Sequence, residues 1–232
     1  FQKTLRDSNR NFTFDHIRIT NSKNHDPILI IELGGTFLKL FIIQKTKGKI
    51  KILKEFKKAF YQNIIYSPQI LFKRLASDIF TFVTEKERSS IKQAYFLFNY
   101  SQKLFYRTPQ LLDGICENFG KDHLSRDIIG HQIGQGLEKV LQDEFKNLKL
   151  SISSDALAGV LSVYQKSPIP KIFFNLIAGT GTNLSILYQK EEKLQFCNTE
   201  FGNFENFSPS SFDLKLIKKT APGYQLEKMF SG

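Results

Sequence analysis

Residues 28–43 read ILIIELGGTFLKLFII, two apolar runs with a glycine turn between them. Each run has the length and the composition of a buried strand, so the stretch predicts a strand, a tight turn and a second strand. The turn consists of Gly34, Gly35 and Thr36. Because glycine has no Cβ atom, backbone N–H groups in such a turn can approach a phosphate group closely, and Thr36 adds a hydroxyl donor.

Residues 173–188 read FFNLIAGTGTNLSILY and repeat this arrangement. The second turn consists of Gly179, Thr180, Gly181 and Thr182. One glycine turn between strands is usually structural, whereas two in one chain favour a pair of phosphate-binding turns. Neither turn carries the Lys-Ser/Thr pair of a P-loop, which excludes a P-loop enzyme. Neither opens a helix, so a dinucleotide-binding fold is a poor fit.

Strand and helix patterns alternate along the rest of the chain, which predicts the α/β class. Helices are expected over residues 68–85 and 123–147, where apolar residues recur at helical spacing. Another helix is expected to begin at Asp155, and an Asp at a helix start is most often a cap. Further strands are expected over residues 49–56, 94–100, 148–153 and 193–198, and a last helix near residues 224–230.

The overall composition is that of a globular protein. The chain has 232 residues, of which 41% are hydrophobic and 24% charged, and this excludes wholesale disorder. No apolar run reaches the roughly 20 residues of a membrane span. Two cysteines without metal-ligand spacing give neither a disulfide framework nor a metal site, so a reducing, cytoplasmic location is expected.

The positive charge is concentrated at one end of the chain. The formal net charge is +11, and residues 1–60 hold 13 Lys and Arg against 5 Asp and Glu. A lysine cluster lies within this part and comprises Lys45, Lys47, Lys49, Lys51, Lys54, Lys57 and Lys58. We favour an edge hairpin whose lysines prevent pairing with other strands. The alternative is a surface for RNA, a ribonucleoprotein or an anionic membrane.

Three further segments complete a recognisable order of motifs. After the first glycine stretch come SISSDALAGVL at 151–161, the second glycine stretch, FCNTEFGNF at 196–204 and APGYQLEKMFSG at 221–232. In this combination the chain resembles the hexokinase family of the actin-like ATPase superfamily, with its ribonuclease H-like fold, from residue 27 to residue 232. The resemblance implies a two-lobed kinase in which Asp155 takes the proton of a hexose 6-hydroxyl. It also implies that ATP, bound with Mg²⁺, donates the phosphoryl group and that the two glycine turns line its phosphates.

The same resemblance assigns the remaining site residues. The sugar ligands that it implies are Asn99, Asp113, Ser154, Asn183, Glu200 and Glu227. On the phosphate side it implies Glu32, at a position that usually serves the metal through water, and Lys39, at the position of an Arg. Several of these are departures from the family pattern: Asp113 replaces a lysine, Ser154 an asparagine and Glu32 an aspartate.

The domain organisation expected from the resemblance has four parts. Residues 1–26 form a basic polar arm, residues 27–60 the first strands of the large lobe, residues 61–170 the small lobe and residues 171–232 a partial large lobe. The family continues beyond the last motif with an adenosine-binding stretch, which residues 1–232 do not contain.

Three functions remain open at this stage. The first is an ATP-dependent hexose kinase whose activity is weakened or lost through the replaced sugar ligands. The second is a catalytically inactive hexokinase-like protein that binds RNA, a ribonucleoprotein or a protein assembly through its basic N-terminal quarter. The third is a kinase for another sugar or polyol, in which Asp113 favours an amino sugar.

Overall fold

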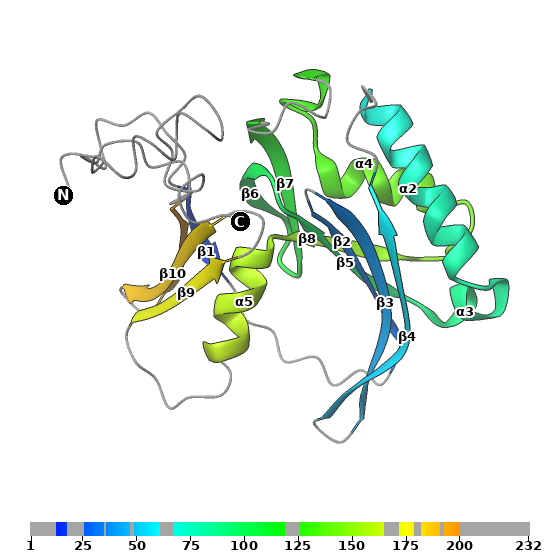
Figure 1. Cartoon of the computed structure of the whole chain (residues 1–232), viewed down its shortest axis with the longest axis horizontal. Helices are drawn as coiled ribbons and strands as arrows, with labels where there is room; N and C mark the ends of the chain where they lie inside the picture. Colours follow the sequence, from blue (N-terminus) through cyan, green and yellow to red (C-terminus); the bar gives the residue numbers. More distant parts are fainter. Residues whose placement is uncertain are drawn as a thin grey trace, which may run out of the picture. The chain divides into compact units, whose positions relative to one another are not determined.

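A computed structural model describes residues 13–17, 26–34, 36–46, 49–60, 67–118, 126–164, 172–178, 182–190 and 193–199 (Figure 1). The chain divides into two compact units. The five-stranded unit lies within Ile19–Asp155, and the four-stranded unit combines Phe1–Arg18 with Ala156–Gly232. The predicted helix near residues 224–230 lies outside the described residues.

A mixed sheet forms the centre of the five-stranded unit, with the order β4-β3-β2-β5-β8. The first three strands are antiparallel neighbours, whereas β5 and β8 run parallel to β2. The predicted strand–turn–strand of residues 28–43 is therefore confirmed, and the strands predicted over residues 49–56, 94–100 and 148–153 are also present. The strands are β2 (Ile28–Leu33), β3 (Phe37–Thr46), β4 (Lys49–Ala59), β5 (Gln93–Phe98) and β8 (Lys149–Ser153).

One face of β2, β3, β5 and β8 is buried because apolar residues alternate in register across these neighbouring strands. Ile31 of β2 is paired with Leu40 of β3 and with Phe96 of β5, and all three have no exposed surface. Helix α2 (Pro68–Phe82) contributes Leu75 and Ile79, which are equally buried. This apolar layer holds the ends of the parallel strands at fixed positions.

Helix α2 begins where the sequence predicts and ends three residues earlier. Ser67 caps its start by accepting a hydrogen bond from the backbone of Ile70, and Pro68 follows at the first position. The helix stops because Val83 is extended, and Thr84 then starts the short helix α3 (Glu85–Ser90) with a capping box to Glu87. The last residues of the predicted helix therefore belong to the start of a second helix.

The helix predicted over residues 123–147 is shorter in the structure. Helix α4 spans Ile133–Leu141, and the described residues 126–132 before it contain only the short 3₁₀ turn η1 (Arg126–Ile128). Gly130 has φ of 85°, a left-handed conformation that ends regular right-handed helix. Gln132 next forms a bridge with Ile115. The prediction of one long helix is thus wrong. The apolar residues before Gly130 and those after it have helical spacing in the sequence, but they lie in different structural elements.

Helix α4 packs against α2 at Gly136. A Cβ atom at this position would lie 2.3 Å from Cε2 of Phe72, whose side chain is buried. We expect Gly136→Ala to lower the free energy of unfolding by about 1–3 kcal/mol, because a well-packed interface has no room for a methyl group. Urea unfolding measures the change, with the exposed Lys139→Ala on the same helix as the control. Equal stability of the two variants would contradict this packing.

A hairpin that the sequence analysis does not predict follows β5. Strands β6 (Ser101–Thr108) and β7 (Leu111–Asn118) are antiparallel and turn at Pro109 and Gln110. The hairpin contacts β8 and α4. It supplies three side chains that form hydrogen bonds to β8 or α4, namely Gln102, Arg107 and Asp113.

The four-stranded unit contains an antiparallel sheet with the order β1-β11-β10-β9. Strands β9 (Ile172–Ala178), β10 (Thr182–Lys190) and β11 (Lys193–Asn198) confirm the second predicted glycine hairpin and the strand after it. Strand β1 (Thr13–Ile17) pairs with β11, so the predicted N-terminal arm is wrong for these five residues. Helix α5 (Asp155–Tyr164) spans the residues predicted for it.

The domain boundaries differ from those expected. Strands β2 to β4, expected in the large lobe, share one sheet with β5 and β8, which were expected in the small lobe. Residue 60 is therefore no boundary between units. The N-terminal strand β1 belongs to the same sheet as β9 to β11, far from it in sequence.

Candidate active site

The carboxyl ends of three neighbouring parallel strands meet at one edge of the five-stranded sheet. Leu33 at the end of β2 is paired with Phe98 at the end of β5, and Leu97 is paired with Ser153 at the end of β8. In open α/β sheets, ligands bind outside the carboxyl ends of the strands. We call this place the carboxyl edge, and Gly34, Asn99 and Asp155 follow the three strands there.

The turn after β2 is a closed hairpin turn. The backbone N–H of Gly34 donates to the carbonyl oxygen of Phe37 at 3.0 Å, and Thr36 is exposed. The Gly34 amide is thus already hydrogen-bonded within the turn, and the exposed Thr36 remains the residue of this turn that we expect to donate to a phosphate. Gly35 lies outside the described residues.

Glu32 and Lys39 face each other across β2 and β3. They are directly paired in the antiparallel register, and Nζ of Lys39 donates to Oε1 of Glu32 at 2.7 Å. Both side chains keep part of their surface exposed. Glu32 and Lys39, both predicted on the phosphate side, therefore form an ion pair. A ligand close to this pair would meet both charges together.

Asn99 and Asp155 meet at the carboxyl edge although 56 residues separate them in the chain. The backbone N–H of Asp155 donates to Oδ1 of Asn99, with an N···O distance of 2.9 Å. Asp155 is the first residue of α5, so the predicted base lies in the first turn of a helix that starts directly after β8. Ser154, which precedes it, is 7% exposed.

The side chain of Gln102 bridges the ends of β5 and β8 with two hydrogen bonds. Its Nε2 atom donates to the carbonyl oxygens of Phe98, at 3.0 Å, and Ser153, at 3.3 Å. The side chain is buried, and a Cβ atom on Gly114 would lie 2.2 Å from its Oε1 atom. Sequence reasoning missed Gln102, because a single glutamine in a strand gives no signal that it bridges two strand ends.

Tyr100, next to Asn99, stays protonated in any ordinary assay. Burial raises the pKa of its hydroxyl to about 12, with a smaller contribution from the charge of Cys116. Its ring packs against Phe98 with 4.9 Å between centroids. The segment after β5 is therefore anchored on both sides of Asn99.

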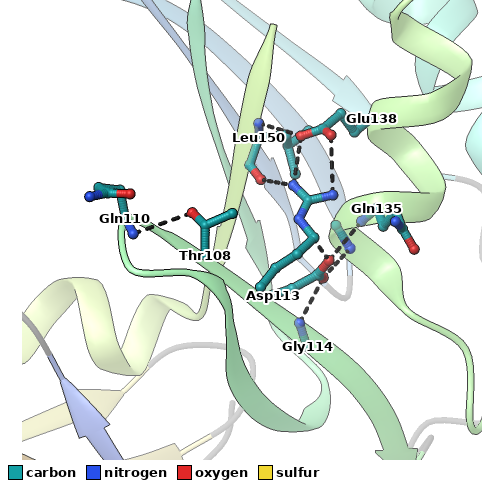
Figure 2. Close-up of polar contacts among 9 residues, drawn as sticks. Thr108, Gln110, Asp113, Gly114, Gln135, Glu138 and Leu150 are labelled. Atoms are coloured by element: carbon teal, nitrogen blue, oxygen red, sulfur yellow. Dashed lines mark hydrogen bonds and ion pairs between the residues drawn. The ribbon is translucent and has the colours of Figure 1, made fainter.

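Asp113 is fully buried and accepts hydrogen bonds from backbone groups of the protein itself. Its side chain has no exposed surface, and Oδ1 accepts hydrogen bonds from the backbone N–H groups of Gly114 and Gly134, each at 2.8 Å (Figure 2). Oδ2 accepts one from Gln135 at 3.0 Å. Asp113 thus caps the start of α4 from a neighbouring strand, which explains why the Gln132 side chain makes no cap bond.

Next to this cap lies an ion pair between Arg107 and Glu138. Arg107 makes two hydrogen bonds to Glu138, at 3.1 and 2.7 Å, and a third to the carbonyl oxygen of Leu150 at 3.2 Å (Figure 2). Glu138 in turn accepts from the backbone N–H of Leu150 at 2.8 Å. This network fastens the β6–β7 hairpin and α4 to β8, the strand that leads to Asp155.

Comparison of the sequence with protein-family models and with curated proteins finds no match. Among solved structures, a hexokinase from Schistosoma mansoni complexed with glucose matches 95% of this chain with a TM-score of 0.73 at 23% identity. The chain has a hexokinase fold. It covers 53% of that hexokinase, so it spans about half the length of the protein that it matches. A glucokinase from an Antarctic psychrotroph matches 90% of this chain and 62% of its own, with a TM-score of 0.47 at 16% identity.

The hexokinase fold confirms the predicted α/β class and the resemblance to hexokinases at the level of fold. The site assignments that came with the resemblance stay predictions, and the burial of Asp113 in a helix cap weighs against its predicted contact to a sugar. Glu200 and Glu227 lie outside the described residues, as do Gly179, Thr180 and Gly181 of the second glycine turn. Thr182 is the first residue of β10.

Asn183 is held within the four-stranded sheet. Its Nδ2 atom donates to Oδ1 of Asn198 at 2.8 Å, and its own Oδ1 accepts from the backbone N–H of Leu184 at 2.8 Å. A carboxamide offers two donors and two acceptor sites, so one of each is used here. The remaining capacity is compatible with the predicted contact to a sugar.

The lysine cluster lies on the β3–β4 hairpin, and β4 is the edge strand of its sheet. Lys54 pairs with Glu87 at 3.1 Å, Lys58 pairs with Asp78 at 2.7 Å, and Nζ of Lys57 lies 4.0 Å from the ring centroid of Phe37. Three of the cluster's lysines thus bind their own unit. The favoured interpretation as an edge hairpin is confirmed, whereas binding of RNA or a ribonucleoprotein stays a prediction.

Neither a membrane span nor a metal cluster is found in the described part of the chain. None of its helices is long and apolar enough to cross a membrane. Within the same residues, no three His, Cys, Asp or Glu side chains come together as a metal site.

Proposed function

We propose that the carboxyl edge is the reaction centre of an ATP-dependent hexose kinase, with Asp155 as the general base. The observation that carries this proposal is the position of Asp155 at the end of β8, where its backbone bonds Asn99, in the row of strand ends that includes the turn after β2. The hexokinase fold supports it, since β2, its turn, β5 and β8 lie in one sheet of that fold.

The chemistry needs one group that moves a proton. Asp155 accepts the proton of the sugar 6-hydroxyl while that oxygen forms a bond to the γ-phosphorus of ATP. The bond from the γ-phosphorus to the bridging oxygen breaks, and ADP leaves with the electron pair. ATP arrives as its Mg²⁺ complex, so the metal enters with the substrate. We assign to the exposed Thr36 a hydrogen bond from its hydroxyl to a phosphate oxygen.

The test is hexose-dependent ADP production by the whole protein with Mg-ATP. We expect ADP release to rise at least tenfold when one of glucose, mannose, fructose or glucosamine is added, and that hexose to raise the melting temperature. Inclusion of glucosamine tests whether an amino sugar is preferred. Folded protein without hexose-dependent turnover or thermal shift would contradict the proposal.

A hexokinase-like protein without turnover is the second candidate, and one observation favours it. Asp113, at the position of the family's sugar-binding lysine, is buried in a helix cap, which supports the loss of this sugar contact. A hydrogen bond to a charged group contributes about 1.5–3 kcal/mol, which corresponds to roughly tenfold to a hundredfold in rate. Nucleotide binding without hexose-dependent turnover is the result expected for this candidate.

A further inference from the structure

We infer that Asn99 is a positioning residue for Asp155, which it holds through the backbone amide of that residue. The inference rests on the proposed role of Asp155 as the base. The resemblance to hexokinases suggested a different role for Asn99, a direct contact to the sugar. The structure instead places its Oδ1 atom 2.9 Å from the backbone nitrogen of Asp155.

The bond satisfies a group that the helix itself leaves unpaired. The first N–H groups of an α-helix have no partner within the helix. They are usually satisfied by the side chain directly before the helix. For Asp155 the acceptor is Asn99, which directly follows the neighbouring strand β5 and lies 56 residues earlier in the chain. The direction of the Asp155 amide therefore depends on the pairing of strands in the sheet as well as on the neighbouring residues in the chain.

Further hydrogen bonds link the strand ends on both sides of this bond. The backbone N–H of Asn99 donates to the carbonyl oxygen of Leu33 at 3.4 Å, and Leu33 and Phe98 have no exposed surface. On the other side, Gln102 bonds the carbonyl oxygens of Phe98 and Ser153, two residues before Asp155. Asn99 therefore connects the phosphate turn after β2 with the start of α5.

Position is the quantity that matters for a base in phosphoryl transfer. A misplacement of about 1 Å can lower the rate by roughly a hundredfold. The backbone nitrogen of Asp155 is one bond from the Cα atom that carries the carboxylate, so loss of the bond to Asn99 lets the carboxylate move. Loss of a sugar contact, by contrast, weakens binding of the hexose.

The experiment compares Asn99→Ala with Asn99→Asp in the hexose-dependent assay. We expect Asn99→Ala to lower kcat by 10- to 100-fold while the KM for the hexose changes less than threefold. Asn99→Asp keeps the shape and the acceptor oxygen, so it is expected to recover kcat to within fivefold of the unmodified protein. The exposed Gln142→Ala is the matched control, with kcat within twofold. A tenfold rise in KM with little change in kcat for Asn99→Ala would establish a sugar contact and overturn the inference.

Hydrogen exchange of the Asp155 amide tests the bond without any substrate. We expect at least tenfold faster exchange in Asn99→Ala than in the unmodified protein, and near-normal exchange in Asn99→Asp. Equal exchange in all three proteins overturns the inference. Absence of turnover in the unmodified protein refutes the proposed function instead, and turnover that Asn99→Ala leaves intact refutes only the role of Asn99.

Discussion

Asp155→Asn is expected to lower hexose-dependent turnover by about 10²–10⁴-fold, which is the contribution of a positioned general base. Asparagine has nearly the same shape but cannot accept the hydroxyl proton. The hydrogen bond from residue 155 to Asn99 uses the backbone, so it persists in the variant. Measurement of kcat and KM for the hexose separates the two effects: kcat falls, and KM stays close to its original value.

The control for this variant is Asp143→Asn, an exposed aspartate in the turn after α4. It changes the net charge by the same amount and is expected to leave kcat within twofold. Urea unfolding of both variants tests whether the fold is intact. Turnover of the folded Asp155→Asn protein at the rate of the unmodified protein would remove Asp155 from the mechanism.

The part of the site that could be predicted is the part with a local sequence signal. Residues 28–43 carry two apolar runs and a glycine turn, and these became β2, its turn and β3. Asp155 stands between the end of a strand pattern and the start of a helix pattern, and the structure has both boundaries there. A polar residue that follows the end of a strand can be recognised from the sequence alone, because this does not require knowing which strands are neighbours in the sheet.

Contacts between distant segments could not be predicted in this way. The bond from Asp155 to Asn99 depends on β5 and β8 being parallel neighbours, and Gln102 bridges the same two strands. The pairing of β1 with β11 joins residues that are about 180 positions apart. Side chains of this kind have no periodic pattern, so the resemblance could only place Asn99 by alignment, with a role taken from another sequence.

The lysine cluster illustrates that a count of charges in the sequence does not show which charges are paired. From the sequence it offers a positive surface to phosphate-rich partners, yet Lys54, Lys57 and Lys58 each contact an acidic or aromatic side chain of their own unit. Exposed ion pairs of this kind contribute little to stability, typically below 1 kcal/mol. They nevertheless reduce the charge that the hairpin presents to a ligand.

Asp113→Ala is expected to have the largest effect on stability, lowering the free energy of unfolding by roughly 3–5 kcal/mol. Removal of the buried carboxylate leaves the backbone N–H groups of Gly114, Gly134 and Gln135 without an acceptor. Each buried unsatisfied group costs about 1–3 kcal/mol. The start of α4 loses its cap, and Arg107, 3.9 Å from Asp113, loses a neighbouring negative charge.

Asp113→Asn separates this structural role from the predicted role in sugar binding. It keeps one acceptor oxygen for the helix cap, so the loss of stability is expected to be smaller, at about 1–2 kcal/mol. Since the residue is fully buried, the KM for the hexose is expected to stay within twofold in this variant. Urea unfolding and the hexose-dependent assay measure the two quantities on the same protein. A large rise in KM at unchanged stability would return Asp113 to the sugar site, whereas lower stability at unchanged KM identifies it as the cap of α4.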